Sequence, residues 1–472
     1  MKLIKVKTLS KWMVAGMLLA TATGCKKDFL DLRPFTSLTP EDALKTESDL
    51  RVAMNGAYQG LRGADLFGRT VPVLGDLMGD NVYQHPQNSN RYTQFNLFAH
   101  AVNDGNAAGL WSQAYSTILR CNNIINSPLT GTPAISQIKG EAKAVRALLY
   151  FNLVRFFARP FSDNPAGLGV PIVLTYDVAL KPTRSTVQEV YTQILKDLSE
   201  GYTEMTTFTN SSIMHKFAAR ALEAKVHLNM GNMAAALTAA NDVITNSGFT
   251  VVPAATYGAY WASATFRTDR VETLFEVSMD AVGNLGFDAL GYIYNQNGYG
   301  DMMISDEVYG LMADTDVRKA LYLPSATGQP RHPAVYVRKY NNIQTDRDET
   351  KLLRMSEVYF IAAEASIASN PTNALNFLNF VATRRNPSFT GYTSTGTQLL
   401  EDILKERRVE LACEGDRYHD LQRLKRTVQR STNFPSAARS IDYANFRRIL
   451  PIPEQETNAN PAIKPQQNPG YQ

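Results

Sequence analysis

Apolar residues recur every three or four positions over long stretches of the chain, a spacing that predicts amphipathic helices. The clearest stretch covers residues 134–157, and Arg159-Pro160 ends it. Its apolar stripe consists of Ala142, Val145, Leu149, Leu153 and Phe156. The other stretches of this kind cover about 40–61, 109–126 and 186–205. The pattern therefore predicts a mainly α-helical protein.

Two helix ends carry local signals of their own. Thr39 suits the N-cap of the first helix and Pro40 its first turn, so this helix is predicted to run from about Pro40 to Leu61. Residues 399–414 form another helical stretch, and Gly415 is placed to cap its C-terminal end.

Helix–turn–helix units occur twice after residue 214. Residues 215–245 are rich in Ala and break at Gly231-Asn232, and residues 354–385 break at Asn370-Pro371. A length of about 34 residues per unit is the tetratricopeptide period. Counting the helices above, we expect about four helix pairs, separated by loops, in an interrupted α-solenoid core.

The helical pattern is lost over residues 250–347, which are rich in Tyr, Gly and Asn. Alternating pieces at 273–278 and 334–340 predict short strands, so an irregular, loop-rich subdomain is expected to pack on the helical core. The tail over 448–472 is predicted to be extended and to wrap the fold, because it contains five prolines. These are Pro451, Pro453, Pro461, Pro465 and Pro469.

The N-terminus has the features of a secretory signal peptide over residues 1–24. Four lysines precede an apolar run, residues 12–20, that is too short to span a bilayer. Gly24-Cys25 resembles a bacterial lipobox, although Ala22 stands where Leu is commonest. We expect acylation of Cys25, which would anchor the protein by lipid and leave residues 25–39 as a tether. The alternative is an ordinary secreted protein with an unmodified cysteine.

Charge and cysteine content exclude some classes of protein. Without residues 1–24, the 448-residue chain has 44 basic and 44 acidic residues, so it lacks the basic excess typical of nucleic-acid binding. Cys121 and Cys413 lie in apolar helical patterns and are predicted to be core thiols and not a disulfide.

No catalytic or metal-binding motif is evident in the sequence. The six histidines include no helical His-x-x-x-His pair, and neither a Gly-x-Ser-x-Gly elbow nor a phosphate-binding loop occurs. A carboxylate pair such as Asp76 with Asp80 is the one route to glycoside hydrolysis that remains open. The charged residues after 405 are better explained as an ion-pair network. They are Glu406, Arg407, Arg408, Glu410, Glu414, Arg417 and Asp420.

Two stretches, 81–106 and 283–303, combine aromatic rings with amide side chains and lack core-forming periodicity. A sugar ring offers an apolar C–H face for aromatic stacking and a hydroxyl rim for hydrogen bonds. With Trp261, these stretches supply the candidate ligand-binding residues. They are Tyr83, Tyr92, Asn96, Trp261, Tyr292, Tyr294, Asn295 and Tyr299. The alternative is that the rings pack the loops onto the core, which is the role expected of Trp111 in its helix.

Segments across nearly the whole chain together resemble the SusD-like (RagB/SusD) nutrient-binding lipoproteins of Bacteroidota. The segments are residues 25–31, 140–157, 353–365, 406–423, 449–453 and 467–471. Each is weak alone, but they occur in the family's order. The chain departs from the family pattern at Ala22 and at Cys413, where a bulkier residue is usual.

The resemblance implies a tetratricopeptide-like core facing a TonB-dependent transporter of the SusC class in the outer membrane. It implies a surface-exposed lipoprotein that captures oligosaccharides, or peptides in some members, without catalysis or a cofactor. The residue pattern Lys26-Lys27-Asp28 loosely resembles the signal that sends such lipoproteins to the cell surface. Calcium occurs in this family, but no EF-hand-like loop places it here.

The implied organisation has three parts after the tether: an N-terminal helical region over 40–249, an inserted ligand-binding subdomain over 250–347 and a C-terminal region over 348–472. Two alternatives to a glycan receptor remain at this point. One is a peptide-binding receptor, and the other is a helical-repeat scaffold that binds only proteins.

Overall fold

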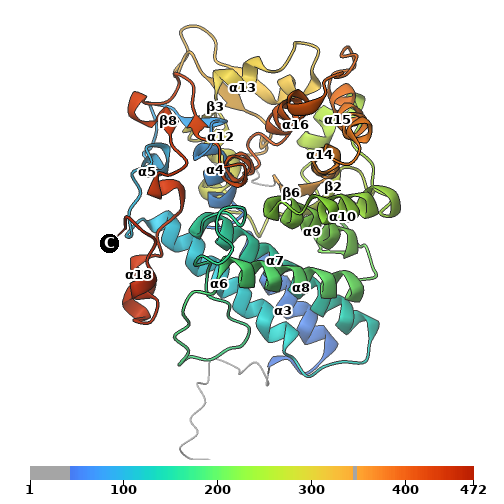
Figure 1. The fold of residues 1–472 in the computed structure, drawn as a ribbon, viewed down its shortest axis with the longest axis vertical. Coiled ribbons are helices and arrows are strands. Elements are labelled where there is room, and N and C mark those ends of the chain that lie inside the picture. The colour runs from blue at the N-terminus through green and yellow to red at the C-terminus, as the bar shows by residue number, and fades with distance from the viewer. Residues whose placement is uncertain (1–42, 344–347, 472) are drawn as a thin grey trace, which may run out of the picture. The chain divides into compact units, whose positions relative to one another are not determined.

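Helices that pack against their neighbours along the chain build most of the fold, as the computed structural model in Figure 1 shows. The structure describes residues 43–343 and 348–471, and the residues from Thr46 onward form one unit, which is the subject of the following description. The predicted signal peptide, tether and Cys25 lie outside the described residues. Within the described ranges, no helix combines the length and the apolar character needed to cross a membrane.

Eight helices form a consecutive series in which each packs on the next. They are α3 (Glu47–Leu61), α6 (Gly105–Ile125), α7 (Pro133–Phe157), α8 (Val187–Glu204), α9 (Lys216–Met230), α10 (Met233–Asn246), α14 (Met355–Ser366) and α15 (Pro371–Arg385). Taken in order they make four pairs. The prediction of a mainly α fold with about four helix pairs is confirmed.

Local capping explains several of the helix boundaries. The Thr132 side chain accepts a hydrogen bond from the backbone N–H of Ile135 at the start of α7. Thr186 and Glu189 form a capping box that begins α8. Gly231, with φ at 78°, ends α9 in the left-handed conformation, as the predicted break requires.

Two predicted helix ends are wrong. Helix α3 starts at Glu47 instead of about Pro40, because Thr46 and Asp49 form the capping box there. Helix α16 (Gly396–Glu410) ends before Glu414, and Gly415 is not its cap. Gly415 has φ at +90°, and a Cβ on it would lie 2.7 Å from the Cα of Pro72, so glycine is needed for close backbone contact.

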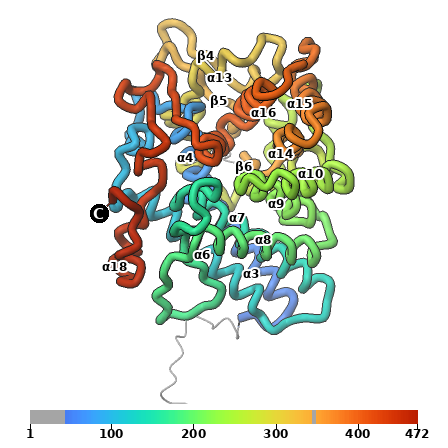
Figure 2. The backbone as a smooth tube through the Cα atoms, viewed as in Figure 1, coloured from blue at the N-terminus to red at the C-terminus, as the bar shows by residue number. Residues whose placement is uncertain are grey.

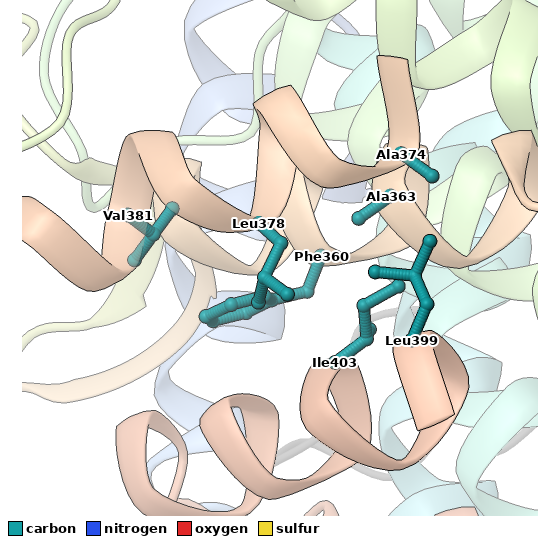
Figure 3. Packing of buried hydrophobic residues seen from close by; sticks show 7 residues of the cluster. All are labelled: Phe360, Ala363, Ala374, Leu378, Val381, Leu399 and Ile403. Atoms are coloured by element: carbon teal, nitrogen blue, oxygen red, sulfur yellow. The ribbon is translucent and has the colours of Figure 1, made fainter. Parts of the chain in front are cut away.

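Helices α14, α15 and α16 lie together, as Figure 2 shows. Figure 3 shows the apolar side chains between them. The cluster consists of Phe360, Ala363, Ala374, Leu378, Val381, Leu399 and Ile403. The small alanines allow close approach of the helix backbones, which supports the predicted packing of the second helix–turn–helix unit.

Short elements fill the regions between the long helices. The short helices are α4 (Thr70–Leu77), α5 (Thr93–Asn96), α11 (Tyr257–Ala262), α12 (Leu290–Tyr294), α13 (Asp306–Gly310), α17 (Arg417–Arg423) and α18 (Glu454–Ala459). Four antiparallel strand pairs join β1 (Val82–Gln84) to β3 (Met302–Ile304), β2 (Thr273–Val277) to β6 (Thr350–Arg354), β4 (Tyr322–Pro324) to β5 (Val335–Val337), and β7 (Val428–Gln429) to β8 (Ser440–Ile441). Strands β2 and β5 confirm the two predicted strand segments.

The C-terminal tail is not extended throughout, since it includes α18 and short 3-10 turns. It is fastened to α7 by Asn468, whose side-chain amide donates to the carbonyl oxygens of Phe157 at 2.8 Å and Leu450 at 2.7 Å. The first bond adds a partner to the Phe157 carbonyl at the end of α7, which also accepts from Arg184, and the second bond joins Asn468 to an earlier part of the tail.

The predicted ion-pair network is confirmed and lies in the interior. The Glu410 carboxylate accepts from Arg354 at 2.8 Å and from Arg385 at 2.9 Å, and Glu272 compensates the same two guanidinium groups. The other predicted members are also ion-paired, namely Glu406, Arg407, Arg408, Glu414, Arg417 and Asp420. Cys121 and Cys413 are buried free thiols, also as predicted.

Candidate ligand-binding site

The two aromatic and amide-rich stretches lie beside each other in the structure. Strand β1 from the first pairs with strand β3 from the second. Beyond the strands, the backbone N–H of Ser89 donates to the Asp301 carboxylate at 2.9 Å, and the N–H of His85 donates to the Asp301 carbonyl at 2.9 Å. Residues more than 200 positions apart in the sequence therefore form one surface.

A row of rings lies on this surface, which we call the aromatic strip: Phe287, Tyr292 and Tyr299. Phe287 is 69% exposed, and the two tyrosines are partly exposed. The ring centres of Phe287 and Tyr292 are 5.1 Å apart, and those of Tyr292 and Tyr299 are 6.0 Å apart. Arg91 adds a guanidinium group 3.7 Å from the centre of the Tyr299 ring. The strip offers apolar ring faces beside a cation.

A tight turn after α12 holds the strip together. The Asn295 side-chain oxygen accepts from the Asn297 N–H at 2.9 Å, and the Tyr299 N–H donates to the Tyr292 carbonyl at 2.7 Å. The Asn295 amide group also donates to Asn341 at 3.0 Å, which joins the turn to the chain after β5. Asn295 is thus a positioning residue for the two tyrosines.

An open cleft of about 780 Å³ adjoins the strip. Its polar lining comes from three segments and includes Gln87, Gln296, Asn297, Ser325, Gln329 and Arg331. Leu323, Pro324, Pro330 and Tyr336 give it an apolar side. Each amide carries both donors and an acceptor, and most of these amide side chains are exposed, so the cleft presents groups that match sugar hydroxyls.

Six of the eight predicted site residues are buried, with exposed fractions of at most 4%. They are Tyr83, Tyr92, Asn96, Trp261, Tyr294 and Asn295. Five of them, namely Tyr83, Tyr92, Asn96, Trp261 and Tyr294, are too buried to contact a ligand. For the four rings the alternative interpretation, packing of the loops onto the core, describes the structure better.

Specific contacts explain why these rings turn inward. The Tyr92 hydroxyl bonds Arg69 at 2.9 Å and Thr70 at 2.8 Å, and Tyr294 stacks on Tyr340. Tyr83 lies in a buried cluster with Met303, Ala334, Tyr336 and Phe434. Trp261 is surrounded by the charged groups of Lys339, Lys351 and Arg354 at 4.7–5.4 Å from its ring, so it belongs to the ion-pair network.

Sequence reasoning missed one side of the cleft. Gln329 and Arg331 come from the β4–β5 connection, which lies within the irregular region but lacks the dense aromatic pattern used to choose candidates. The signal that was present is a turn-rich polar stretch, Ser325 to Pro333, just before the predicted strand segment 334–340. The ligand-binding prediction now rests on Tyr292 and Tyr299.

The carboxylate pair considered for hydrolysis is buried. Asp76 accepts hydrogen bonds from Asn81 at 2.8 Å and Gly415 at 2.6 Å, and burial raises its pKa to about 7. Burial also opposes ionisation of Asp80, but Arg417 and Arg408 outweigh it and lower the pKa of Asp80 overall. Both groups are committed to internal contacts. In the described part of the chain, no three His, Cys, Asp or Glu side chains gather as metal ligands.

The sequence matches known protein families and individual proteins over most of its length. Residues 254–471 match the model of the SusD family, and residues 28–228 match a family described as "Starch-binding associating with outer membrane". The chain is similar to SusD-like protein P2 of Formosa agariphila, with 26% identity over 518 aligned residues, 96% of this chain and 98% of that protein.

Solved structures give the same result. A SusD superfamily protein from Bacteroides thetaiotaomicron is 30% identical, with a TM-score of 0.82 over 90% of this chain and 100% of that one. Another from Bacteroides vulgatus is also 30% identical, with a TM-score of 0.83 over 91% of this chain and 100% of that one. With these family matches, and with solved structures 30% identical to it over about nine tenths of its length, the chain belongs to the SusD family.

Proposed function

We propose that this protein is a surface-exposed outer-membrane lipoprotein that binds oligosaccharide and delivers it to a SusC-like TonB-dependent transporter. Membership of the SusD family supports a role in nutrient binding, and one matching family is described as starch-binding and associated with the outer membrane. Acylated Cys25 is the proposed anchor. Binding and release need no catalytic group and no cofactor.

The observation that carries this proposal is the aromatic strip next to an amide-lined cleft. Stacking of a sugar on Tyr292 or Tyr299 would bury apolar C–H groups, while Gln296 and Asn297, which lie between them in the chain, face hydroxyl groups. Because rings and amides come from loops on a rigid helical scaffold, the ligand can change between family members without a change of fold.

We assign a different role to each of the three parts of the chain. The region over 250–347 supplies the strip and most of the cleft, and the loop within 40–249 adds Arg91 and Gln87. The region over 348–472 contributes the ion-paired helices that fix the base of the fold. The transporter would meet the helical core, which leaves the strip free to take up ligand.

Isothermal titration of the full-length protein in detergent with oligosaccharides and peptides of matched length tests the proposal. We expect an oligosaccharide to bind, and a Tyr292→Ala/Tyr299→Ala double variant to lose at least about tenfold in affinity, since two stacking faces are removed. Tyr176→Ala is the matched control, because Tyr176 is 58% exposed on a loop that contacts α6. Binding of peptides alone would favour a peptide receptor, and retention of transporter binding without any small ligand would favour a scaffold.

A further inference from the structure

We infer that the cleft beside the aromatic strip selects an anionic oligosaccharide, one with carboxylate or sulfate groups, and that Arg331 binds the anionic group. This inference rests on the proposed function, because it names the class of glycan that the same site takes. The carboxylate of a uronic acid and a sulfate ester share the relevant chemistry, an anion with two or more oxygen atoms in one plane or face.

The charge of the cleft is the first observation. Among the described residues that line it, Arg331 is the only charged one, and the other polar residues are neutral amides and a serine. In residues 43–343 and 348–471, no carboxylate lies within ion-pair distance of Arg331. Asp288, near the other end of the strip, is paired with Arg69, so it does not oppose an incoming anion at the cleft.

The way Arg331 is held is the second observation. Its Nε donates to the Gln87 carbonyl at 2.9 Å, which orients the guanidinium and leaves the two terminal nitrogens without a hydrogen-bond partner in the described structure. A Cβ on Gly300 would lie 2.7 Å from Nη1 of Arg331, so the guanidinium is adjacent to the chain that carries Tyr299. A ligand stacked on Tyr299 would therefore place a substituent near this cation.

Backbone conformation at Arg331 is the third observation. Its φ is +66°, in the left-handed region that side chains with a Cβ rarely adopt. Residues held in this region cluster at active sites, ligand clamps and switch regions. The bond from Arg331 Nε to the Gln87 carbonyl restrains the same side chain, so the guanidinium is oriented before a ligand arrives.

A second cation lies at the strip itself. Arg91 stacks on Tyr299, and its nearest carboxylate, that of buried Asp301, is 4.0 Å away and already accepts hydrogen bonds from Ser89. Arg91 thus lies on the Tyr299 ring, and Arg331, from the β4–β5 connection, lies next to the following residue, Gly300. Arginine binds planar anions through two parallel N–H donors, which a neutral sugar would not use.

The test compares three oligosaccharides of matched length by isothermal titration with the full-length protein: a neutral maltohexaose, a hexagalacturonate and a sulfated carrageenan-type hexasaccharide. We expect at least one acidic probe to bind about tenfold or more tightly than the neutral one at low salt, and this advantage to shrink as NaCl is raised. The galacturonate and sulfated arms identify which anion is preferred.

Variants separate the anion contact from general loss of the fold. Arg331→Gln is expected to remove the preference for the acidic probe and to leave binding of the neutral probe within about twofold. Arg331→Lys is expected to restore only part of the preference, because lysine lacks the bidentate geometry. Arg338, the residue after β5, is exposed and does not line the cleft. The control Arg338→Gln is therefore expected to change neither the preference for the acidic probe nor the binding of the neutral probe.

The other outcomes contradict the inference in distinguishable ways. Binding of the neutral probe equal to or tighter than that of both acidic probes would overturn the anionic preference and leave the proposed function standing. Equal loss of neutral and acidic binding in Arg331→Gln would overturn the role of Arg331 as the anion contact. Binding of acidic peptides with no response to any glycan would overturn both the inference and the proposed function.

Discussion

The guanidinium carbon of Arg91 lies 3.7 Å from the centre of the Tyr299 ring. The two residues belong to loops that are separated by most of the N-terminal helical series, and their contact joins those loops at the candidate site. A cation over a ring favours one orientation of both groups, because the contact is attractive by about 0.5–1 kcal/mol. The pairing of β1 with β3 brings the loops together, and this contact sets the position of the last ring in the strip.

Replacement of Arg91 by Ala should weaken oligosaccharide binding about two- to fivefold, because an exposed cation–π contact contributes about 0.5–1 kcal/mol. Isothermal titration measures the change in affinity, and the melting temperature should fall only slightly, because the contact contributes no more than about 1 kcal/mol to the folded state. Arg384→Ala is the control, since Arg384 makes the same kind of contact with Phe380, at 3.5 Å, away from the site. An equal loss of affinity in both variants would show that Arg91 has no particular role.

Glu410→Gln should destabilise the protein strongly. Glu410 is fully buried between Arg354 and Arg385, so removal of its charge leaves buried guanidinium groups undercompensated, at an expected cost of about 3–5 kcal/mol. Denaturant titration measures the free energy of unfolding. In the control Glu401→Gln, loss of an exposed pair with Arg426 should cost less than about 1 kcal/mol. Similar small effects in both variants would refute a structural role for the network.

Two glycine substitutions should have opposite signs. Gly415→Ala should destabilise the protein by about 1–3 kcal/mol or more, because the new methyl group would meet the backbone of Pro72 and because φ is positive. Gly56→Ala, within α3, has no atom within 4 Å of the new Cβ and should stabilise by about 0.5–1 kcal/mol. Unfolding free energies test both. Destabilisation by Gly56→Ala, or a neutral Gly415→Ala, would contradict the described packing.

Glu349 predicts a dependence of stability on pH. Its carboxylate is buried without a hydrogen-bond partner, and burial, aided by the nearby Glu276 charge, raises its pKa to about 8. Because the folded state holds this proton more tightly than the unfolded chain does, the contribution of Glu349 to stability falls as pH rises from about 4.5 to about 8.

Glu349→Gln removes this titration, and the variant should gain stability relative to the wild type over the same pH range, by several kcal/mol at pH 8.5, since each unit of pKa difference corresponds to about 1.4 kcal/mol. Unfolding measured for both proteins at pH 5 and pH 8.5 gives the comparison. A stability difference that stays constant with pH, or that moves against the variant at high pH, would mean that Glu349 is ionised in the folded protein.

The helical core could be predicted from the sequence because its information is local. The stripe of α7 repeats over about four turns, and the charged residues after 405 lie at spacings that a helix brings together. The start of α3 was placed too early because Thr39-Pro40 and Thr46 both have the features of a helix start. In the structure, Thr46 forms the capping box of α3 with Asp49. Residue types alone do not indicate which of the two possible helix starts is used.

Composition indicated the two stretches that form the candidate site, but it could not indicate which of their side chains are exposed. Tyr292 and Tyr294 are two positions apart on a single turn of helix. Yet the Tyr292 ring belongs to the aromatic strip, beside Tyr299, whereas the buried Tyr294 ring stacks on Tyr340. That partner is 46 positions away, and the short helix α12 has too few residues for a periodic pattern to indicate its buried face. Arg331 was missed for the same reason, since its contacts with Gln87 and Gly300 are long-range.

A crystal structure of the protein with a bound oligosaccharide would show directly whether the aromatic strip binds sugar. We expect a sugar ring stacked on Tyr292 or Tyr299, with its hydroxyl groups bonded to amides of the adjoining cleft. A sugar bound elsewhere, for example along the helical pairs, with the aromatic strip uncovered, would contradict it.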